Sequence, residues 1–544
     1  MTIDAPELSA ARSGAGGSPR TRNSLWGRDV GGRLPLPLVG LALLAGLARL
    51  PYLLTPMMPD EGGFLMVAHQ WGHGSSLYGN YWVDRPPLLI GLFWVADQLG
   101  RVVGPLAGLR LVGVVAVSVT VLAVGVAALR VAGRRAALWS GGTAAVLLVT
   151  PLVGATAVNG ELLATPFIAA GVAFTTVALT ASSTRRAVWA AALAGAAGVA
   201  AVLVKQNMVD VFVFAAVAVV LAGWRKAAST GVVRLVLAAG AGAVAALVVL
   251  LGLAASLGTM PGAVLFAMYP FRVRAAGVMG HAGVNDRVNR LSSIAFNELI
   301  SGGLVVLVVL AVALVLRRFG SRPLAWAVSV ATVLLGAYGV FSVLAGGSYW
   351  THYLVQLIVP TALATGLLVS ALPRLGAVLG TLVVLVGVVT WGLGLVGSTG
   401  APGPVIGDAI GASAKPGDTM VSLLGDADIL ETAGLTSPYT YLWSLPARTL
   451  DPHLHRLTRV LSGPKAPTWI AVRNAATQKK LDQEGTGAVM RAHYHQVAVM
   501  CGHTIYLRNG VRRPPLARPS TCTRPLTIVS PVDLSFSVLH PSKR

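Results

Sequence analysis

Long apolar segments recur along this chain, and they constrain its fold more than any other feature. Runs such as LVGLALLAGL, VVAVSVTVLAVGVAAL and GTLVVLVGVVTWGLGLV approach or reach the roughly 20 residues that cross the hydrocarbon core of a bilayer. Hydrophobic residues make up 55% of the 544 residues and charged residues 11%, and the mean hydropathy is +0.71. This composition excludes an ordinary soluble protein and predicts an all-α polytopic membrane protein.

Reading the apolar runs in order predicts about eleven transmembrane helices. The segment 86–100, PPLLIGLFWVADQLG, is shorter than a span, so we expect it to lie in the external interface or to re-enter it. A twelfth helix at this segment is the alternative, and it would reverse the polarity of all later loops. The expected spans lie near residues 36–54, 107–130, 136–153, 162–181, 187–204, 208–223, 232–257, 299–317, 323–344, 353–372 and 375–397.

The basic residues predict the orientation of these helices. The net charge is +22, but the arginines are scattered over short loops instead of forming one basic face, which argues against nucleic acid as a partner. The eleven-span topology places every basic cluster on the cytoplasmic side together with the N-terminus, as the positive-inside rule requires. The sequence therefore predicts a multi-pass protein of the cell membrane with a cytoplasmic N-terminus and an extracytoplasmic C-terminal domain.

Composition divides the chain into three parts. Residues 1–34 are polar and rich in Gly, Ser and Arg, so we expect a disordered cytoplasmic tail. Residues 35–397 form the predicted membrane domain, whose first external loop spans 55–106. Residues 398–544 return to soluble composition and predict a small α/β domain with a Pro-rich end: strands at 418–425 and 467–473, helices at 427–435 and 474–485, and a hairpin at 495–510.

The chain has two cysteines, Cys501 and Cys522, and both fall in this C-terminal domain. An external location permits a disulfide between them. Two free thiols are the alternative. The cysteines show no CxxC pattern and no zinc-type spacing.

Acidic residues are scarce in the membrane domain, and the predicted topology places all of them at or near the external face. Ionisable groups near a bilayer are costly and tend to mark pathways or active sites. A cluster of acids on one face therefore predicts a reaction or binding surface there. Between residues 36 and 397 the acids are Asp60, Glu61, Asp84, Asp97, Glu161, Asp210, Asp286 and Glu298.

Asp60 and Glu61 follow Pro59 in the first external loop and precede a helical stretch. A helix N-terminus whose dipole favours carboxylates would explain them without any chemistry. The functional interpretation makes one of them a general base that deprotonates an acceptor hydroxyl at the membrane surface, with the neighbouring acid orienting it.

Cationic residues on the same predicted face are candidates for binding an anion. Arg85 follows Asp84 directly before a double proline, and an interfacial ion pair is the alternative explanation. Lys205 follows the run AALAGAAGVAAVLV and precedes Gln206, with pairing to Asp210 or snorkelling as the alternative. A lysine on the external side runs against the charge bias, so an anionic lipid phosphate is the functional interpretation.

Other motifs are less specific. Glu161 begins a helix on the same face, either as a cap or as a site residue. His352 and Tyr353 lie in an aromatic segment, YWTHY, which an interfacial aromatic belt explains equally well. His69 and His73 are four residues apart, but no third ligand is spaced nearby, so we expect no metal site there. The sequence shows no Walker, GxSxG or dinucleotide motif and predicts no cofactor, although a divalent metal remains open.

Five segments occur in a familiar order: the acidic pair after the first span, LYGNYWVDRPPLL, NGELLATPF, LVKQN and GGSYWTHYLVQLIVP. Over residues 36–397 the chain resembles the polyprenyl-phosphate-sugar-dependent glycosyltransferases of the protein O-mannosyltransferase and aminoarabinose transferase superfamily, which have the GT-C fold. The resemblance implies a lipid-linked sugar donor, an external active site and inversion at the anomeric carbon.

Carried over motif by motif, the resemblance implies roles for individual residues. Asp60 matches the family's base, and Glu61 and Glu161 look like supporting acids at the catalytic centre. Asp84 and Arg85 match an acidic and basic pair in which the family usually has Lys in the second place. Lys205 and His352, with Gln206 and Tyr353 beside them, match positions that look like contacts to the carrier phosphate.

The sequence thus predicts an inverting glycosyltransferase that moves a sugar from a polyprenyl-phosphate carrier to an acceptor hydroxyl on the external face. A cell-wall glycan, a lipoglycan or a protein remains open as the acceptor, as do mannose, arabinose and other sugars. A transporter or lipid flippase is the alternative from another class, but it should show repeat symmetry and a polar path through the membrane. A non-catalytic scaffold for the C-terminal domain is a third interpretation.

Overall fold

The computed structural model describes residues 35–73, 77–280, 284–396, 398–473 and 475–525. The predicted tail, residues 1–34, and the far part of the Pro-rich end lie outside the described residues. The described residues from Pro35 onward belong to one compact unit. The boundary that the sequence predicts near residue 397 stays a prediction.

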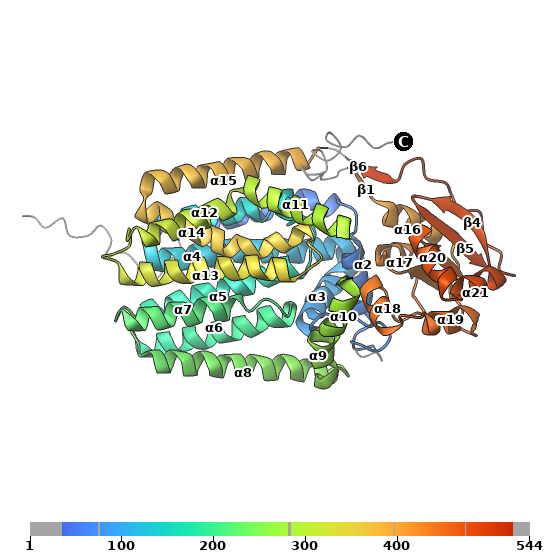
Figure 1. Ribbon diagram of the computed structural model, residues 1–544, viewed down its shortest axis with the longest axis horizontal. Coiled ribbons are helices and arrows are strands. Elements are labelled where there is room, and N and C mark those ends of the chain that lie inside the picture. The colour runs from blue at the N-terminus through green and yellow to red at the C-terminus, as the bar shows by residue number, and fades with distance from the viewer. Residues whose placement is uncertain (1–34, 74–76, 281–283, 397, 474, 526–544) are drawn as a thin grey trace, which may run out of the picture. The chain divides into compact units, whose positions relative to one another are not determined.

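The membrane part is helical, and Figure 1 shows its long helices running side by side in a bundle. Prolines begin many of these helices, where the missing N–H costs nothing and the fixed φ suits the first turn. The elements are α1 (Leu36–Ala48), η1 (Leu50–Leu54), α2 (Pro59–Gln70), α3 (Pro87–Val103), α4 (Pro105–Leu147), η2 (Pro151–Val153), α5 (Gly160–Thr180), α6 (Thr184–Val204), α7 (Asp210–Trp224), α8 (Val232–Ser256), α9 (Pro261–Met268), α10 (Pro270–Gly280), α11 (Val284–Ser301), α12 (Gly303–Val315), α13 (Pro323–Ala345), η3 (Thr351–Leu357), α14 (Ile358–Ala371) and α15 (Pro373–Gly394).

Among the described residues, eight helices are long and apolar enough to cross a membrane. The number rises to nine if α11 and α12, which are bent by 63° at Gly302, form one span. Helix α7 is apolar but has only 15 residues. Helix α3, which contains most of the segment 86–100, is not among the candidate spans, in line with the sequence prediction that it is too short to cross.

Helix α4 is continuous in its residue range but reverses direction at Gly133, whose φ of 85° and ψ of −175° are not helical. A Cβ placed on Gly141 would lie 3.7 Å from Cγ1 of Val121, although 20 residues of straight helix would separate the two by roughly 30 Å. Leu38 of α1 contacts both halves, at Gly125 and at Gly141. Helix α4 is therefore an antiparallel pair, which accounts for the two spans that the sequence predicts at 107–130 and 136–153.

Each of the eleven predicted spans overlaps helical elements among the described residues, yet their number depends on how three elements are counted. These are the reversed helix α4, the short helix α7 and the bent pair α11 and α12. The total of eleven stays a prediction. The predicted run at 299–317 is not a single helix, because Gly302 adopts a left-handed conformation, with φ 73°, between α11 and α12.

The C-terminal residues form small helices around two sheets. Strands and helices occur in each of the segments where the sequence predicts them. The elements are β1 (Ser398–Gly400), α16 (Pro402–Ser413), β2 (Met420–Leu423), α17 (Ala427–Ala433), α18 (Ser444–Leu450), α19 (His455–Ser462), β3 (Trp469–Val472), α20 (Ala475–Gln483), α21 (Thr486–His493), β4 (Tyr494–Met500), β5 (His503–Arg508) and β6 (Thr523–Pro525).

The larger sheet has the strand order β2-β3-β5-β4, visible in part in Figure 1. Strands β2 and β3 are parallel and buried, and β5 runs antiparallel to both β3 and β4. The hairpin between β4 and β5 turns at Cys501 and Gly502. Strands β1 and β6 form a second, two-stranded antiparallel sheet. Cys501 and Cys522 are joined in a disulfide, with their Cα atoms 5.4 Å apart.

The reversal of α4 should depend on glycine at position 133. Its φ and ψ lie in a region that is essentially restricted to glycine, so Gly133→Ala should destabilise the protein by about 1–3 kcal/mol. Gly142→Ala is the matched control, because a Cβ there meets nothing within 4 Å and Ala favours a helix over Gly. Thermal unfolding of the purified protein in detergent measures the difference. Equal midpoints for the two variants would contradict the reversal.

Candidate functional site

The structure brings most of the predicted site residues together from five separate parts of the chain. Asp60 lies in the first turn of α2, Arg85 precedes α3, and Glu161 lies in the first turn of α5. Lys205 caps the C-terminus of α6, and His352 lies in η3. Each residue stands at or near a helix end, where the chain can present a polar side chain without breaking the apolar surface that faces lipid.

Glu161 is the buried centre of one cluster, with 3% of its surface exposed. Its Oε1 accepts a close hydrogen bond from Nζ of Lys205 and lies 3.6 Å from Nε2 of His352. The Asn159 side chain caps the helix by accepting a hydrogen bond from the Leu162 N–H at 3.0 Å. That cap leaves the Glu161 carboxylate available for Lys205, so the cap role belongs to Asn159 and not to Glu161.

The Lys205 ammonium also lies over the ring of Tyr353, 4.6 Å from its centroid. The His352 and Tyr353 rings meet edge to face at 5.2 Å. Cation–π contacts hold an ammonium group without neutralising it. Lys205 is thus fixed by one carboxylate and one aromatic face, and it pairs with Glu161 instead of Asp210. Asp210 accepts a hydrogen bond from Gln356 at 2.9 Å.

Asp84 organises a second cluster. Its Oδ2 lies 2.8 Å from Nη1 of Arg85 and 2.8 Å from Nη2 of Arg272 in α10. Burial alone would raise the pKa of Asp84, but Arg272 and Arg85 together outweigh it and hold the pKa below its usual value. Burial works against the charge on Arg85, yet Asp84 and then Asp60 raise the pKa of Arg85 above its usual value. Both shifts favour the charged forms of Asp84 and Arg85.

Arg272 links the two clusters. In the amide orientation that satisfies both side chains, the Gln206 oxygen accepts a hydrogen bond from Nε of Arg272 at 2.7 Å. Gln206 follows Lys205 directly, so the lysine and the arginine are held on adjacent walls of the same space. Arg272 lies between the predicted spans 232–257 and 299–317, and nothing in the sequence pattern there indicates its contact with Asp84.

Arg85, Glu161, Lys205 and Arg272 line a cavity of about 310 Å³, whereas Asp84 and His352 are not part of its lining. Apolar side chains such as Met279, Phe341 and Val343 line it as well. Together with Asp84, which pairs with Arg85 and Arg272, the three cations and Glu161 carry one net positive charge. The complete lining is Arg85, Glu161, Lys205, Gln206, Asn207, Met208, Arg272, Ala276, Met279, Tyr338, Phe341, Ser342, Val343, Ala345, Gly346, Tyr353 and Gln356. The geometry suits an anionic group attached to an apolar chain.

Asp60 lies beside this cavity and is not part of its lining. Its carboxylate interacts electrostatically with Arg85 and His352. Its Oδ1 accepts a hydrogen bond at 2.9 Å from Nε1 of Trp443, a residue of the C-terminal part. Asp60 is partly exposed, whereas Glu61 next to it is 1% exposed.

The two neighbouring acids therefore have different surroundings. Both oxygens of Glu61 form hydrogen bonds with the guanidinium of Arg110, a residue near the start of α4. Glu61 also accepts from the backbone N–H groups of Val158 at 2.7 Å and Met58 at 3.0 Å. A carboxylate so fully engaged is suited to positioning the loop before α2, not to exchanging a proton.

Sequence reasoning missed Arg110 and Trp443. Arg110 carried a usable signal, because an arginine within the predicted span 107–130, and not at its cytoplasmic end like Arg130, calls for an acidic partner. Trp443 carried none, since 383 residues separate it from Asp60.

Several polar residues of the same predicted face do not enter the site. Arg274 lies over the ring of Phe266, and Arg290 lies over that of Trp350. His69 is exposed and lies 3.2 Å from Asp97. Among the described residues, no group of three His, Cys, Asp or Glu side chains is placed to hold a metal ion.

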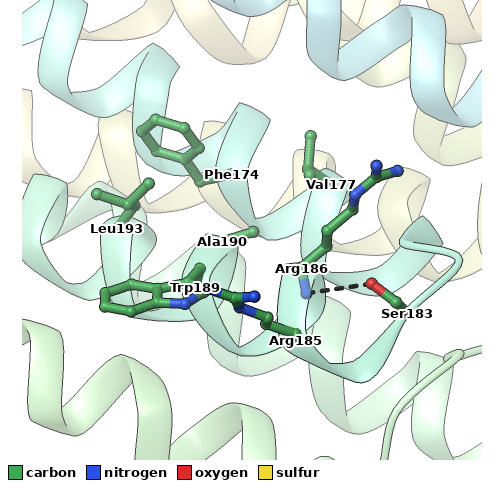
Figure 2. Close-up of a pocket in the computed structure, with 8 residues that line it drawn as sticks. All are labelled: Phe174, Val177, Ser183, Arg185, Arg186, Trp189, Ala190 and Leu193. Atoms are coloured by element: carbon green, nitrogen blue, oxygen red, sulfur yellow. Dashed lines mark hydrogen bonds between the residues drawn. The ribbon is translucent and has the colours of Figure 1, made fainter. Parts of the chain in front are cut away.

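A second hollow, of about 470 Å³, lies far from these residues (Figure 2). Its walls include Val177 near the end of α5 and Arg185, Arg186 and Trp189 near the start of α6. Glu161 and Lys205 stand at the opposite ends of these two helices, so roughly 24 Å of helix separates the two regions. Arginine and tryptophan at helix ends are ordinary at a membrane interface.

No family model matches the chain, and no curated protein matches its sequence. Solved structures of membrane transferases do match. ArnT from Cupriavidus metallidurans, determined with undecaprenyl phosphate, aligns with a TM-score of 0.52 and 15% identity over 87% of this chain and 97% of that one.

The Archaeoglobus fulgidus oligosaccharyltransferase AglB, in complex with an inhibitory peptide and a dolichol-phosphate, gives a TM-score of 0.51 and 12% identity over 89% of this chain and 76% of that one. The same organism's oligosaccharyltransferase with Zn and sulfate gives 0.50 and 13% over 86% and 73%. This chain therefore has the fold of these membrane transferases, as the resemblance in its sequence predicts.

Proposed function

We propose that this protein transfers a sugar from a polyprenyl-phosphate carrier to an acceptor hydroxyl. The observation that carries the proposal is the cavity that Arg85, Lys205 and Arg272 line together with apolar side chains. A sugar phosphate on a long isoprenoid has the same division into an anionic head and an apolar tail. The fold shared with ArnT and AglB supports the proposal.

The three cations would act on the donor phosphate. As the bond between the anomeric carbon and the phosphate oxygen breaks, its electron pair passes to the phosphate and negative charge grows there. Fixed cations aimed at this charge stabilise the transition state without reorganising. Arg85 and Arg272 are held in place by Asp84, and Lys205 by Glu161 and Tyr353. Gln206, through its hydrogen bond with Arg272, would keep the Arg272 guanidinium close to Lys205.

Asp60 would act as the general base on the acceptor side. It is the partly exposed acid, and it lies close enough to Arg85 to interact with it electrostatically. The acceptor oxygen would form its bond to the anomeric carbon from the face opposite the phosphate, while its proton passes to Asp60. This arrangement inverts the anomeric configuration. The polyprenyl phosphate then leaves as the second product.

Glu61 and Glu161 would support this reaction without exchanging protons. Glu61 is held by Arg110 and positions the start of α2, which carries Asp60. Glu161 orients the Lys205 ammonium and lies within electrostatic reach of His352. Of the three predicted catalytic acids, we therefore propose that only Asp60 exchanges a proton with the substrate.

The donor should be the lipid-linked sugar itself. Purified protein in liposomes, given radiolabelled polyprenyl-phosphate mannose or arabinose and cell-envelope acceptors, should release polyprenyl phosphate in step with glycosylated product. No nucleotide sugar should be needed. Turnover with a nucleotide sugar alone, in lipid without polyprenyl carriers, would overturn the proposal.

Arg272 and Arg274 provide a matched pair on one helix, because only Arg272 lines the cavity. Arg272→Met should weaken donor affinity by about 10-fold or more, as expected for one lost charge-assisted hydrogen bond. Arg274→Met removes the same charge outside the cavity and should leave donor affinity near the wild-type value. Donor titrations at fixed acceptor concentration give the comparison. Equal losses in both variants would refute a specific phosphate site.

Substitutions of the neighbouring acids Asp60 and Glu61 should have different effects, one on the reaction rate and the other on stability. Asp60→Asn keeps the shape but removes the proton acceptor, so kcat should fall about 100-fold or more with little change in thermal stability. Glu61→Gln leaves Arg110 buried with a weakened partner and should destabilise the protein by about 3–5 kcal/mol. Kinetics and thermal unfolding of both variants separate the two roles. An active Asp60→Asn protein with normal abundance would exclude Asp60 as the base.

A further inference from the structure

Two consecutive glycines follow the acidic pair in α2 and allow the C-terminal part to approach the helix closely. A Cβ at Gly62 would lie 2.7 Å from the Cα of Asp428 in α17. A Cβ at Gly63 would collide with the Trp443 ring, whose Cε2 would be 2.9 Å away. Contacts this short leave no room for any side chain at either position. The segment PDEGG therefore joins the proposed base to the surface on which the C-terminal part packs.

Trp443 is fixed at this surface by aromatic contacts. Its ring lies 5.2 Å from that of Phe64, and Phe64 lies 5.2 Å from Phe93. The guanidinium of Arg85 lies over the ring of Phe64, 5.8 Å from its centroid. The same set of rings thus contacts the indole that meets Asp60 and the arginine that lines the cavity.

The indole N–H of Trp443 donates to Oδ1 of Asp60 at 2.9 Å. In the part of the chain that the structure describes, no hydrogen bond engages the other oxygen, Oδ2. One oxygen of the carboxylate is therefore anchored, and the other is left to face an acceptor. A single donor to one oxygen fixes the rotation of a carboxylate but does not neutralise it.

We propose that Trp443 is a positioning residue for Asp60, so that the C-terminal part completes the active site. This inference rests on the proposed function, because it assigns Asp60 the role of base. The indole holds Oδ1 so that Oδ2 points toward the acceptor hydroxyl. Without this donor the carboxylate turns freely about its side-chain bonds, and the fraction of time in which it can accept the proton falls.

A second indole in the same part of the chain shows how an ordinary structural contact differs. Trp469 of β3 is 1% exposed and donates its N–H to Oδ2 of Asp418 at 3.2 Å. Both partners belong to the C-terminal residues, and Asp418 is also paired with Arg513. Trp443 instead donates across the chain to a residue of α2. The two tryptophans give a matched pair of substitutions.

The hydrogen bond itself can be tested without any assay of activity. In protein labelled with ¹⁵N at the tryptophan indoles, the Trp443 resonance is assigned by its loss in Trp443→Phe. This resonance should shift upfield in Asp60→Ala, because the indole loses its charged acceptor, while the Trp469 resonance stays in place. An unchanged Trp443 resonance in Asp60→Ala would overturn the inference.

The kinetic test uses the wild-type reaction as its reference. Trp443→Phe should lower kcat about 10-fold, the value expected for one hydrogen bond to a charged group, and leave KM for the lipid donor within about 2-fold. Trp469→Phe should change neither value. Replacing Trp443 by benzothienylalanine, which keeps the ring shape and loses only the N–H, should reproduce the effect of Trp443→Phe without disturbing packing.

The outcomes separate this inference from the proposed function. A wild-type protein that transfers sugar and a benzothienylalanine variant with unchanged kcat would refute the role of Trp443 and leave the proposed function standing. A wild-type protein inactive with every lipid-linked donor would refute the proposed function, and a positioning role for Trp443 would fall with it. Equal losses of kcat in Trp443→Phe and Trp469→Phe would reduce the effect to one of folding.

Discussion

The buried ion pair between Glu61 and Arg110 is the interaction on which the rest of the site depends. It joins the start of α2 to the start of α4, and the backbone N–H of Val158 extends it to the segment that leads into α5. A charge pair with 1–2% exposed side chains is costly unless further hydrogen bonds satisfy it. Two backbone N–H groups do this for Glu61, whereas Nε of Arg110 has no hydrogen-bond partner among the described residues. Asp60 is next to Glu61 in sequence, and Glu161 follows Val158 by three residues. The contacts of Glu61 with Arg110 and Val158 therefore help to fix the position of Asp60 relative to Glu161.

Around this anchor, each cation of the cavity contacts a carboxylate. Lys205 meets Glu161 and Tyr353, while Arg85 and Arg272 share Asp84. Partners of this kind keep side chains ordered in the absence of substrate, which reduces the entropy lost on binding. The two carboxylates neutralise only two of the three positive charges, and the remaining positive charge is available to an anion.

Much of the site could be predicted because acids are rare in an apolar chain and each needs a reason to be there. That argument located Asp60, Glu61, Asp84 and Glu161, and the charge bias located Lys205. It did not reveal that both oxygens of Glu61 are engaged in hydrogen bonds. The partner of Glu61, Arg110, lies within an apolar run that is predicted to be a transmembrane span. Trp443 and the reversal at Gly133 depend on contacts between distant residues and on one backbone conformation. A hydropathy pattern contains no information on such contacts or on backbone conformation. For the same reason it predicts one continuous helix across Gly302, where the structure has a break.

The charge balance of the cavity has a consequence for turnover. A sugar linked through phosphate to a polyprenol is a diester with one negative charge, whereas the released carrier is a monoester that carries up to two near neutral pH. Three cations facing two carboxylates would then hold the product more tightly than the substrate. Bond cleavage would be followed by slow departure of the carrier, and the kinetic signature of such a site is a burst of product in the first turnover. A protein of this design works fastest where the membrane removes the spent carrier.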